Sequence, residues 1–217
     1  LCSAYTNARY KDNLVFGVCE QSDKGIDLKG LAFKNQIKYE LLDPVIAKGP
    51  CWARGRIQNF YSDEDFFLQI DSHTIFAVDW DHILLENHFW LERAQKNNFL
   101  ITGYPRKFEP NDDLSSFHLD TSSKVTWGIA FQKEKIFEDG HYSGQHGFPS
   151  KTFNPLRGFL IAAGFIFAKG KFVKDIPYDP KFYFHGEELS LAIRLFTNNW
   201  NAIYIPEAPL FHFYTDV

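Results

Sequence analysis

The chain has 217 residues, which suits one α/β domain, and 45% of them are hydrophobic, enough for a full core. Its formal net charge of −4 argues against a nucleic-acid-binding protein, which needs a basic face to neutralise phosphates. No run reaches the roughly 18 apolar residues of a membrane span, and the three widely spaced cysteines form no CxxC pair, which argues against a structural zinc site or disulfide framework and favours a reducing, cytoplasmic location.

The first half of the chain alternates strands with helices. The patterns predict the end of a helix over residues 1–10, strands at 14–19 and 37–42, a helix from Gly49-Pro50, a strand at 65–70, a helix over 80–96 and a strand at 98–102. Pro50 suits a first helical turn. Because strands that alternate with helices pair in parallel, we expect an α/β fold with a mostly parallel central sheet and helices on both faces.

The second half is richer in loop-forming residues. We expect a surface loop at 104–119, a strand at 124–132, a second loop at 137–157 and a strand of small apolar residues at 158–167. A turn at 177–180, a helix from Gly186 and strands at 202–205 and 210–214 complete the chain. No internal repeat or linker divides it, so residues 1–217 are expected to form a single domain.

The strongest local signal is Asp71-Ser72-His73, which follows a buried strand. Open α/β sheets bind ligands just outside the carboxyl ends of their strands. A carboxylate and an imidazole two residues apart can face one cation, and nucleotide-sugar enzymes use such a cation to neutralise the diphosphate leaving group. The alternative is that Asp71 caps the turn and His73 is an ordinary loop residue.

A second signal is His212 within the apolar run Pro209-Leu210-Phe211-His212-Phe213-Tyr214. Alternation along a strand places His212 on the face opposite to Phe211 and Phe213, so it can face a polar cleft while they face the core. As a third ligand it would give a mixed imidazole and carboxylate set, which suits Mn²⁺ or Zn²⁺. The alternative is a core histidine with an ordinary hydrogen bond.

The third signal is the acidic pair Glu187 and Glu188, which follows Gly186 at the start of a helix. Acidic side chains are favoured in a first helical turn by the helix dipole, so the pair needs no functional explanation. Alternatively, one carboxylate binds sugar hydroxyls or the acceptor. Since neighbouring helical residues point about 100° apart, only one of the two can face a bound sugar.

Several runs together resemble the cytoplasmic polypeptide N-acetylglucosaminyltransferases that modify hydroxyproline. The same runs are more distantly similar to the polypeptide GalNAc-transferases, and they extend in the family's order over nearly the whole chain. They are Gly49-Pro50-Cys51-Trp52-Ala53-Arg54, Phe67-Leu68-Gln69-Ile70-Asp71-Ser72-His73, Asp79-Trp80-Asp81, Ala163-Gly164-Phe165-Ile166-Phe167, Pro177-Tyr178-Asp179-Pro180, Phe184-His185-Gly186-Glu187-Glu188, Ile205-Pro206-Glu207 and Phe211-His212-Phe213-Tyr214.

The resemblance implies a GT-A fold with a DxH metal motif. It assigns Asp71, His73 and His212 to Mn²⁺ or Mg²⁺ and Arg54, Asp71, Ser72 and His73 to the nucleotide-sugar site. Glu187 and Glu188 become the candidate catalytic residues, beside donor sugar and acceptor. GT-A enzymes usually begin with a strand that carries part of the uridine site, and we expect this chain to start after that strand.

These observations lead us to expect a glycosyltransferase that moves GlcNAc or a related sugar from a UDP-sugar to a hydroxyl of a protein or glycan acceptor. The resemblance implies retention of anomeric configuration. Two alternatives stay open: an inverting GT-A transferase with Glu187 or Glu188 as base, and a non-catalytic module that binds nucleotide-sugar or carbohydrate.

Overall fold

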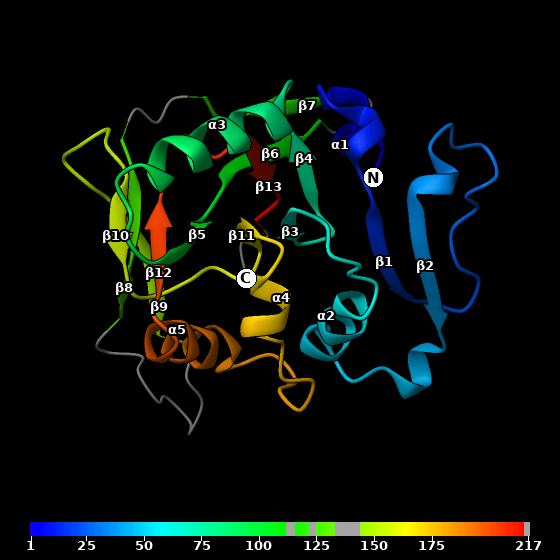
Figure 1. The fold of residues 1–217 in the computed structure, drawn as a ribbon. Helices are drawn as coiled ribbons and strands as arrows, with labels where there is room; N and C mark the ends of the chain where they lie inside the picture. The colour runs from blue at the N-terminus through cyan, green and yellow to red at the C-terminus, as the bar shows by residue number, and fades with distance from the viewer. Residues whose placement is uncertain (112–115, 122–124, 133–143, 215–217) are drawn as a thin grey trace.

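The computed structural model describes residues 1–111, 116–121, 125–132 and 144–214. Its centre is a five-stranded sheet in the order β10-β12-β5-β11-β3, with helices on both faces (Figure 1). The strands are β3 (Phe66–Ile70), β5 (Asn98–Thr102), β10 (Leu156–Gly158), β11 (Phe165–Lys169) and β12 (Trp200–Tyr204). The α/β class is therefore confirmed.

The central sheet is mixed, so the prediction of a mostly parallel sheet is wrong. Only β12 and β5 pair in parallel, whereas β10 with β12, β5 with β11 and β11 with β3 pair antiparallel. The prediction followed from the regular alternation of strand and helix in the first half. β11 instead follows β10 through the short connection 159–164, with no crossover helix between them, and inserts between β5 and β3 in the opposite direction.

The core has two layers because the strands alternate their side chains between the two faces of the sheet. On one face, α3 (Trp80–Glu92) packs Leu84 and Leu91 against Phe99, Ile101 and Phe165. The opposite face is covered by α2 (Pro50–Gln58), α4 (Phe172–Asp175) and α5 (Glu187–Thr197), whose buried side chains lie on Leu100, Ile166, Ala168 and Ala202. None of the helices that the structure describes combines the length and the apolar content that a bilayer crossing requires.

Smaller sheets flank this core. A four-stranded sheet has the order β4-β13-β6-β7, β1 pairs in parallel with β2, and β8 and β9 form an antiparallel pair. Within the described residues the remaining elements are α1 (Cys2–Asn7), β1 (Phe16–Gln21), β2 (Ile37–Leu42), β4 (Thr74–Phe76), β6 (Arg106–Pro110), β7 (Phe117–Leu119), β8 (Trp127–Phe131), β9 (Gln145–Pro149), β13 (Leu210–His212) and short 3₁₀ turns at Lys11–Asn13, Lys34–Gln36 and Pro44–Ile46.

Two predicted loops contain strands. β6 and β7 occupy much of 104–119, and β9 and the start of β10 lie within 137–157, although 112–115 and 137–143 fall outside the described residues. Conversely, the predicted strand 158–167 is interrupted: β10 ends at Gly158 and β11 starts at Phe165. Thr102 explains the interruption, because its hydroxyl bonds both the N–H and the carbonyl of Ala162 and so holds the loop backbone out of the ladder.

Candidate active site

Asp71, His73 and His212 come together just beyond the carboxyl end of β3. β4 and β13 pair antiparallel with His212 opposite Thr74, and the N–H of Phe213 donates to the carbonyl of His73 at 3.0 Å. One ligand atom from each of the three side chains lies within 4.8 Å of the others. His212 Nε2 is 3.3 Å from Asp71 Oδ2, and the two imidazole rings meet edge to face with centroids 4.3 Å apart.

The strand alternation predicted for His212 is confirmed. Phe211 is buried in the core, whereas the His212 side chain is 12% exposed and faces Asp71. Its Nδ1 atom is buried and has no hydrogen-bond partner among the described residues. Two imidazoles and a carboxylate are a donor set that Mn²⁺ or Zn²⁺ accepts. The residues therefore fit a divalent cation, and their assignment as its ligands stays a prediction.

Arg54 connects this cluster to the acidic helix start. It lies on α2, and its guanidinium contacts Asp71 Oδ1 at 2.6 Å and both carboxylate oxygens of Glu187 at 2.8 Å. Tyr178 accepts a further hydrogen bond from Nη1 at 3.2 Å. The N–H groups of Arg54 thus donate to two protein carboxylates and orient Asp71. Contact of Arg54 with the nucleotide-sugar stays a prediction. Ser72 is exposed, and its contact with the nucleotide-sugar also stays a prediction.

The electrostatics keep Asp71 charged. Burial by itself would raise its pKa, but the hydrogen bond with His212 and the positive charge of Arg54 outweigh burial and hold the pKa below its usual value. The pKa of His73 is also lowered, first by burial and then by the neighbouring His212. An ionised Asp71 and a lowered pKa at His73 both favour the deprotonated state that metal ligands require.

Glu187 and Glu188 have different surroundings, as their separation of about 100° around the helix requires. Gly186 precedes them with φ of 83°, a left-handed conformation that suits glycine. Glu187 is 5% exposed and bonds Arg54 and the thiol of Cys51, whose Sγ lies 3.0 Å away. It acts as the buried counter-ion of Arg54.

Glu188 points towards the 159–164 connection instead. The N–H of Ala163 donates to its Oε1 at 2.8 Å, and Gln145 donates to its Oε2. Burial raises the pKa of Glu188 to about 7, opposed by the Ala163 hydrogen bond and reinforced by the charge of Glu187. A carboxyl group with a pKa near neutrality can exchange a proton at physiological pH.

Sequence reasoning missed the backbone that joins these groups. Asp71 N donates to Gly164 O at 3.3 Å, and Gln69 Nε2 donates to Ala163 O at 2.7 Å. A Cβ on Gly164 would lie 2.6 Å from Asp71 Oδ2, so only glycine lets the carboxylate sit there without displacement. The small residues 162–164 are the available signal in the sequence, but their apolar pattern predicts a continuous strand.

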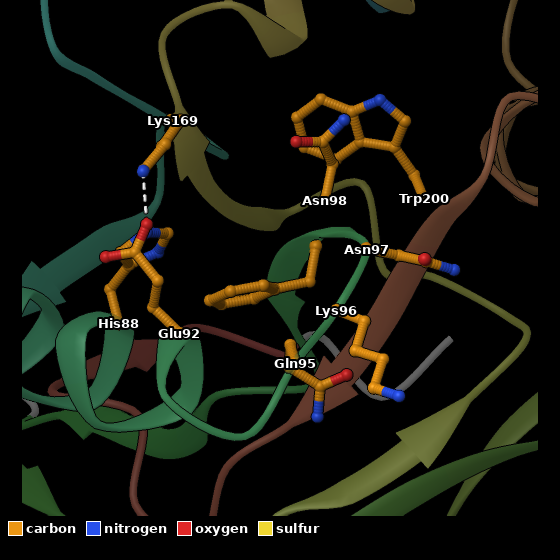
Figure 2. A pocket seen from close by; sticks show the side chains of 9 residues that line it. His88, Glu92, Gln95, Lys96, Asn97, Asn98, Lys169 and Trp200 are labelled. Atoms are coloured by element: carbon orange, nitrogen blue, oxygen red, sulfur yellow. Dashed lines mark hydrogen bonds and ion pairs between the residues drawn. The ribbon is translucent and has the colours of Figure 1, made fainter.

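A separate pocket of about 160 Å³ lies at the other end of the central sheet (Figure 2). Asn98 and Trp200 begin β5 and β12 there, and Lys169 pairs in register with Phe66 at the start of β3. His88 lines the pocket from α3, next to the ion pair between Glu92 and Lys169. This pocket contains none of the predicted site residues.

Comparison with known families identifies the chain. The family model described as Glycosyltransferase (GlcNAc) matches residues 5–216. The chain belongs to this glycosyltransferase family. No curated protein matches the sequence significantly. The finer assignment to cytoplasmic hydroxyproline-modifying enzymes is not part of this finding.

Solved structures support the fold. GalNAc-T7, crystallised with UDP, GalNAc and Mn²⁺, superposes with a TM-score of 0.61 at 13% identity over 98% of this chain. The match covers 40% of the GalNAc-T7 chain, so the family member described here spans less than half of that protein. It confirms the predicted GT-A fold. A197 from STIV matches with a TM-score of 0.38, at 15% identity over 92% of this chain and 94% of that one, too low to indicate a common fold.

Proposed function

We propose that this glycosyltransferase moves GlcNAc from UDP-GlcNAc to a hydroxyl group of a polypeptide acceptor, with a divalent cation at Asp71, His73 and His212. The observation that carries the proposal is the convergence of these three side chains beyond β3. The family description names GlcNAc, and GalNAc-T7, which shares the fold, was crystallised with UDP and Mn²⁺. The resemblance of the sequence to cytoplasmic enzymes that modify hydroxyproline supports a hydroxyproline acceptor and a cytoplasmic location.

Asp71, His73 and His212 would hold the cation, which when bound would supply positive charge to stabilise the departing diphosphate. In the transfer, the bond between C1 of the sugar and the β-phosphate oxygen breaks, and its electron pair leaves with UDP. A new bond forms between C1 and the acceptor oxygen, whose proton must be removed. Arg54 Nη2 lies 2.6 Å from Asp71 Oδ1, whereas His212 Nε2 lies 3.3 Å from Asp71 Oδ2. Because its two oxygens have different partners, the carboxylate keeps one orientation towards the candidate cation site.

Two stereochemical courses differ in where the acceptor proton goes. In a retaining reaction, which the family resemblance supports, the proton passes to the departing phosphate oxygen, and no protein base is needed. In an inverting reaction a carboxylate accepts it. Glu188 is the better candidate of the acidic pair for that role, because its pKa lies near 7 and Glu187 is engaged by Arg54 and Cys51.

The test is a donor-hydrolysis and transfer screen across UDP-sugars, with Mn²⁺, with Mg²⁺ and with chelator. We expect UDP release to be fastest with UDP-GlcNAc and Mn²⁺ and to stop with chelator. NMR of the product's anomeric proton separates retention from inversion. The exposed His118 on β7 provides a control: His118→Ala should keep full cation dependence.

Two results would count against the proposal. Nucleotide-sugar binding without any hydrolysis or transfer would favour a non-catalytic binding module. Full activity in the presence of chelator would exclude the cation from the reaction and leave the three side chains with a structural role.

A further inference from the structure

Gln145 lies at the centre of a hydrogen-bond network that reaches the candidate site from β9. Its Nε2 donates to Glu188 Oε2, to the hydroxyl of Tyr104 at 3.1 Å and to the carbonyl of Ile161 at 3.0 Å. A primary amide has only two N–H groups, so these three acceptors share two hydrogens. Gln145 Oε1 is buried and has no hydrogen-bond partner among the described residues.

Gln145 and Ala163 together fix both oxygens of Glu188. The backbone N–H of Ala163 binds Oε1 and the amide of Gln145 binds Oε2, so the carboxyl group cannot rotate freely. The carbonyl of the next residue, Gly164, accepts a hydrogen bond from the N–H of Asp71. Because Gly164 has no Cβ, it also leaves room for the carboxylate of Asp71. One short backbone segment therefore connects the Glu188 carboxyl group to the cation site.

We propose that Gln145 is a positioning residue that orients the carboxyl group of Glu188 towards the reacting groups. This inference rests on the proposed function, because it assumes that Glu188 faces the donor sugar or the acceptor. An amide suits the position for a chemical reason. Its two N–H groups can donate to the Glu188 carboxylate and to the carbonyl of Ile161 at the same time, which ties Glu188 to the backbone beside Ala163.

The first experiment replaces Gln145 with Met, which keeps the length and approximate bulk of the side chain but cannot donate. We expect kcat to fall by about tenfold or more, since a misplaced Glu188 carboxyl group no longer holds the donor sugar or the acceptor in the reacting geometry. The KM for UDP-GlcNAc and the affinity for Mn²⁺ should change less than about twofold, because neither Arg54 nor Asp71 contacts Gln145.

A matched control is His146→Ala on the same strand. His146 is exposed and follows Gln145 in β9, so its side chain points to the opposite face of the strand. The kcat of His146→Ala should therefore equal that of the unsubstituted enzyme. A Gln145→Met enzyme with reduced melting temperature but unchanged kcat would show that Gln145 only ties β9 to Tyr104 and Ile161. That result would overturn the proposal.

A second measurement does not depend on activity. The Glu188 carboxyl group is titrated by ¹³C NMR and assigned with Glu188→Gln. Gln145→Met removes the N–H group that binds the ionised form of Glu188. We therefore expect the midpoint of the Glu188 titration to move to higher pH. The other charged groups that act on Glu188, namely Glu187, Arg54 and Asp71, are the same in both proteins.

An unchanged midpoint would overturn the proposal even in a chain that transfers no sugar. A raised midpoint in a chain without transfer would instead confirm that Gln145 positions Glu188 and place the failure in the proposed function. The two ideas are thus separable by experiment.

Discussion

Two histidines at opposite ends of the central sheet show how one residue type can serve different purposes. His212 lies beyond the carboxyl end of β3, with Nε2 at 3.3 Å from Asp71. His88 lies at the other end, 1% exposed, stacked on Phe99 with centroids 4.6 Å apart and edge-on to Phe66. Neither of its ring nitrogens has a hydrogen-bond partner among the described residues.

The difference lies in the charge that each ring meets. His212 shares Asp71 with Arg54, so a cation placed there meets an ionised ligand. His88 is surrounded by aromatic rings, and burial lowers its pKa to about 4, so it stays neutral as a polar member of an apolar core. In this chain the histidine that contacts a carboxylate is the candidate ligand, whereas the one packed among aromatic rings belongs to the core.

The largest effect should come from the carboxylate itself. Asp71→Asn removes the negative charge that Arg54 and His212 share, and we expect transfer to fall by about 100-fold or more, because a bound cation contributes several kcal/mol to leaving-group stabilisation. Steady-state UDP release at saturating Mn²⁺ measures the loss, with circular dichroism as the control for folding. Normal turnover at saturating Mn²⁺ would refute the cation assignment.

His212→Ala should produce a smaller loss that separates the two histidines. We expect the affinity for Mn²⁺ to fall on the order of 10–100-fold, while the metal-free protein loses little thermal stability. Isothermal titration calorimetry and thermal melts without metal measure the two quantities. The opposite pattern, with lower stability and unchanged affinity, would make His212 a core residue like His88.

Substitutions of Glu187 and Glu188 should affect different properties, the first mainly stability and the second mainly the pH dependence of kcat. Glu187→Gln weakens the ion pair with the buried Arg54, so we expect a loss of stability of about 1–3 kcal/mol. Glu188→Gln should cost less stability than Glu187→Gln, because it leaves no buried charge unpaired, but it should change the pH dependence of kcat around pH 7. Urea unfolding and pH–rate profiles of both variants test this division, and equal behaviour of the two would contradict it.

The smallest effect at neutral pH is expected at His88. His88→Leu removes unpaired polar atoms from an apolar site, so stability at pH 7 should change by no more than about 1 kcal/mol. The folded pKa of about 4 lies below the ordinary value of 6.5, so between these values the unfolded chain binds a proton that the folded chain does not.

His88 therefore contributes a loss of stability as pH falls, with a slope of up to about 1.4 kcal/mol per pH unit. His88→Leu should remove this contribution, whereas substitution of the exposed His146 should leave it unchanged. Urea unfolding at several pH values between 4 and 7 compares the slopes. An unchanged slope in His88→Leu would show that another group causes the loss.

The sequence predicted the elements whose patterns are local. The strand before Asp71, the helix from Pro50 and the helix from Glu187 are confirmed, and the faces of Phe211 and His212 follow from alternation alone. The direction of β11 could not be read in this way, since the small apolar run 158–167 does not show where a strand stops and a loop begins. Side-chain bonds from Thr102 decide that point.

The candidate site was predictable to a similar extent. Asp71, His73 and His212 carry recognisable chemistry, and the structure brings them together. Gln145 and Ala163 carry none, because a glutamine in a polar stretch and a backbone N–H have no sequence signature. Their importance comes from the three-dimensional contact with Glu188, which only the fold supplies.

The separation of Asp71 and His212 along the chain, 141 residues, also has a kinetic consequence. Contacts between such distant segments require closure of a very long loop, whose entropic cost comes before the contacts can stabilise the chain, so we expect them to form late in folding. β13 must dock beside β4 before the two side chains meet. During refolding from urea, the capacity to bind Mn²⁺ should therefore appear after most of the helical signal has returned, and its recovery would report completion of the native topology.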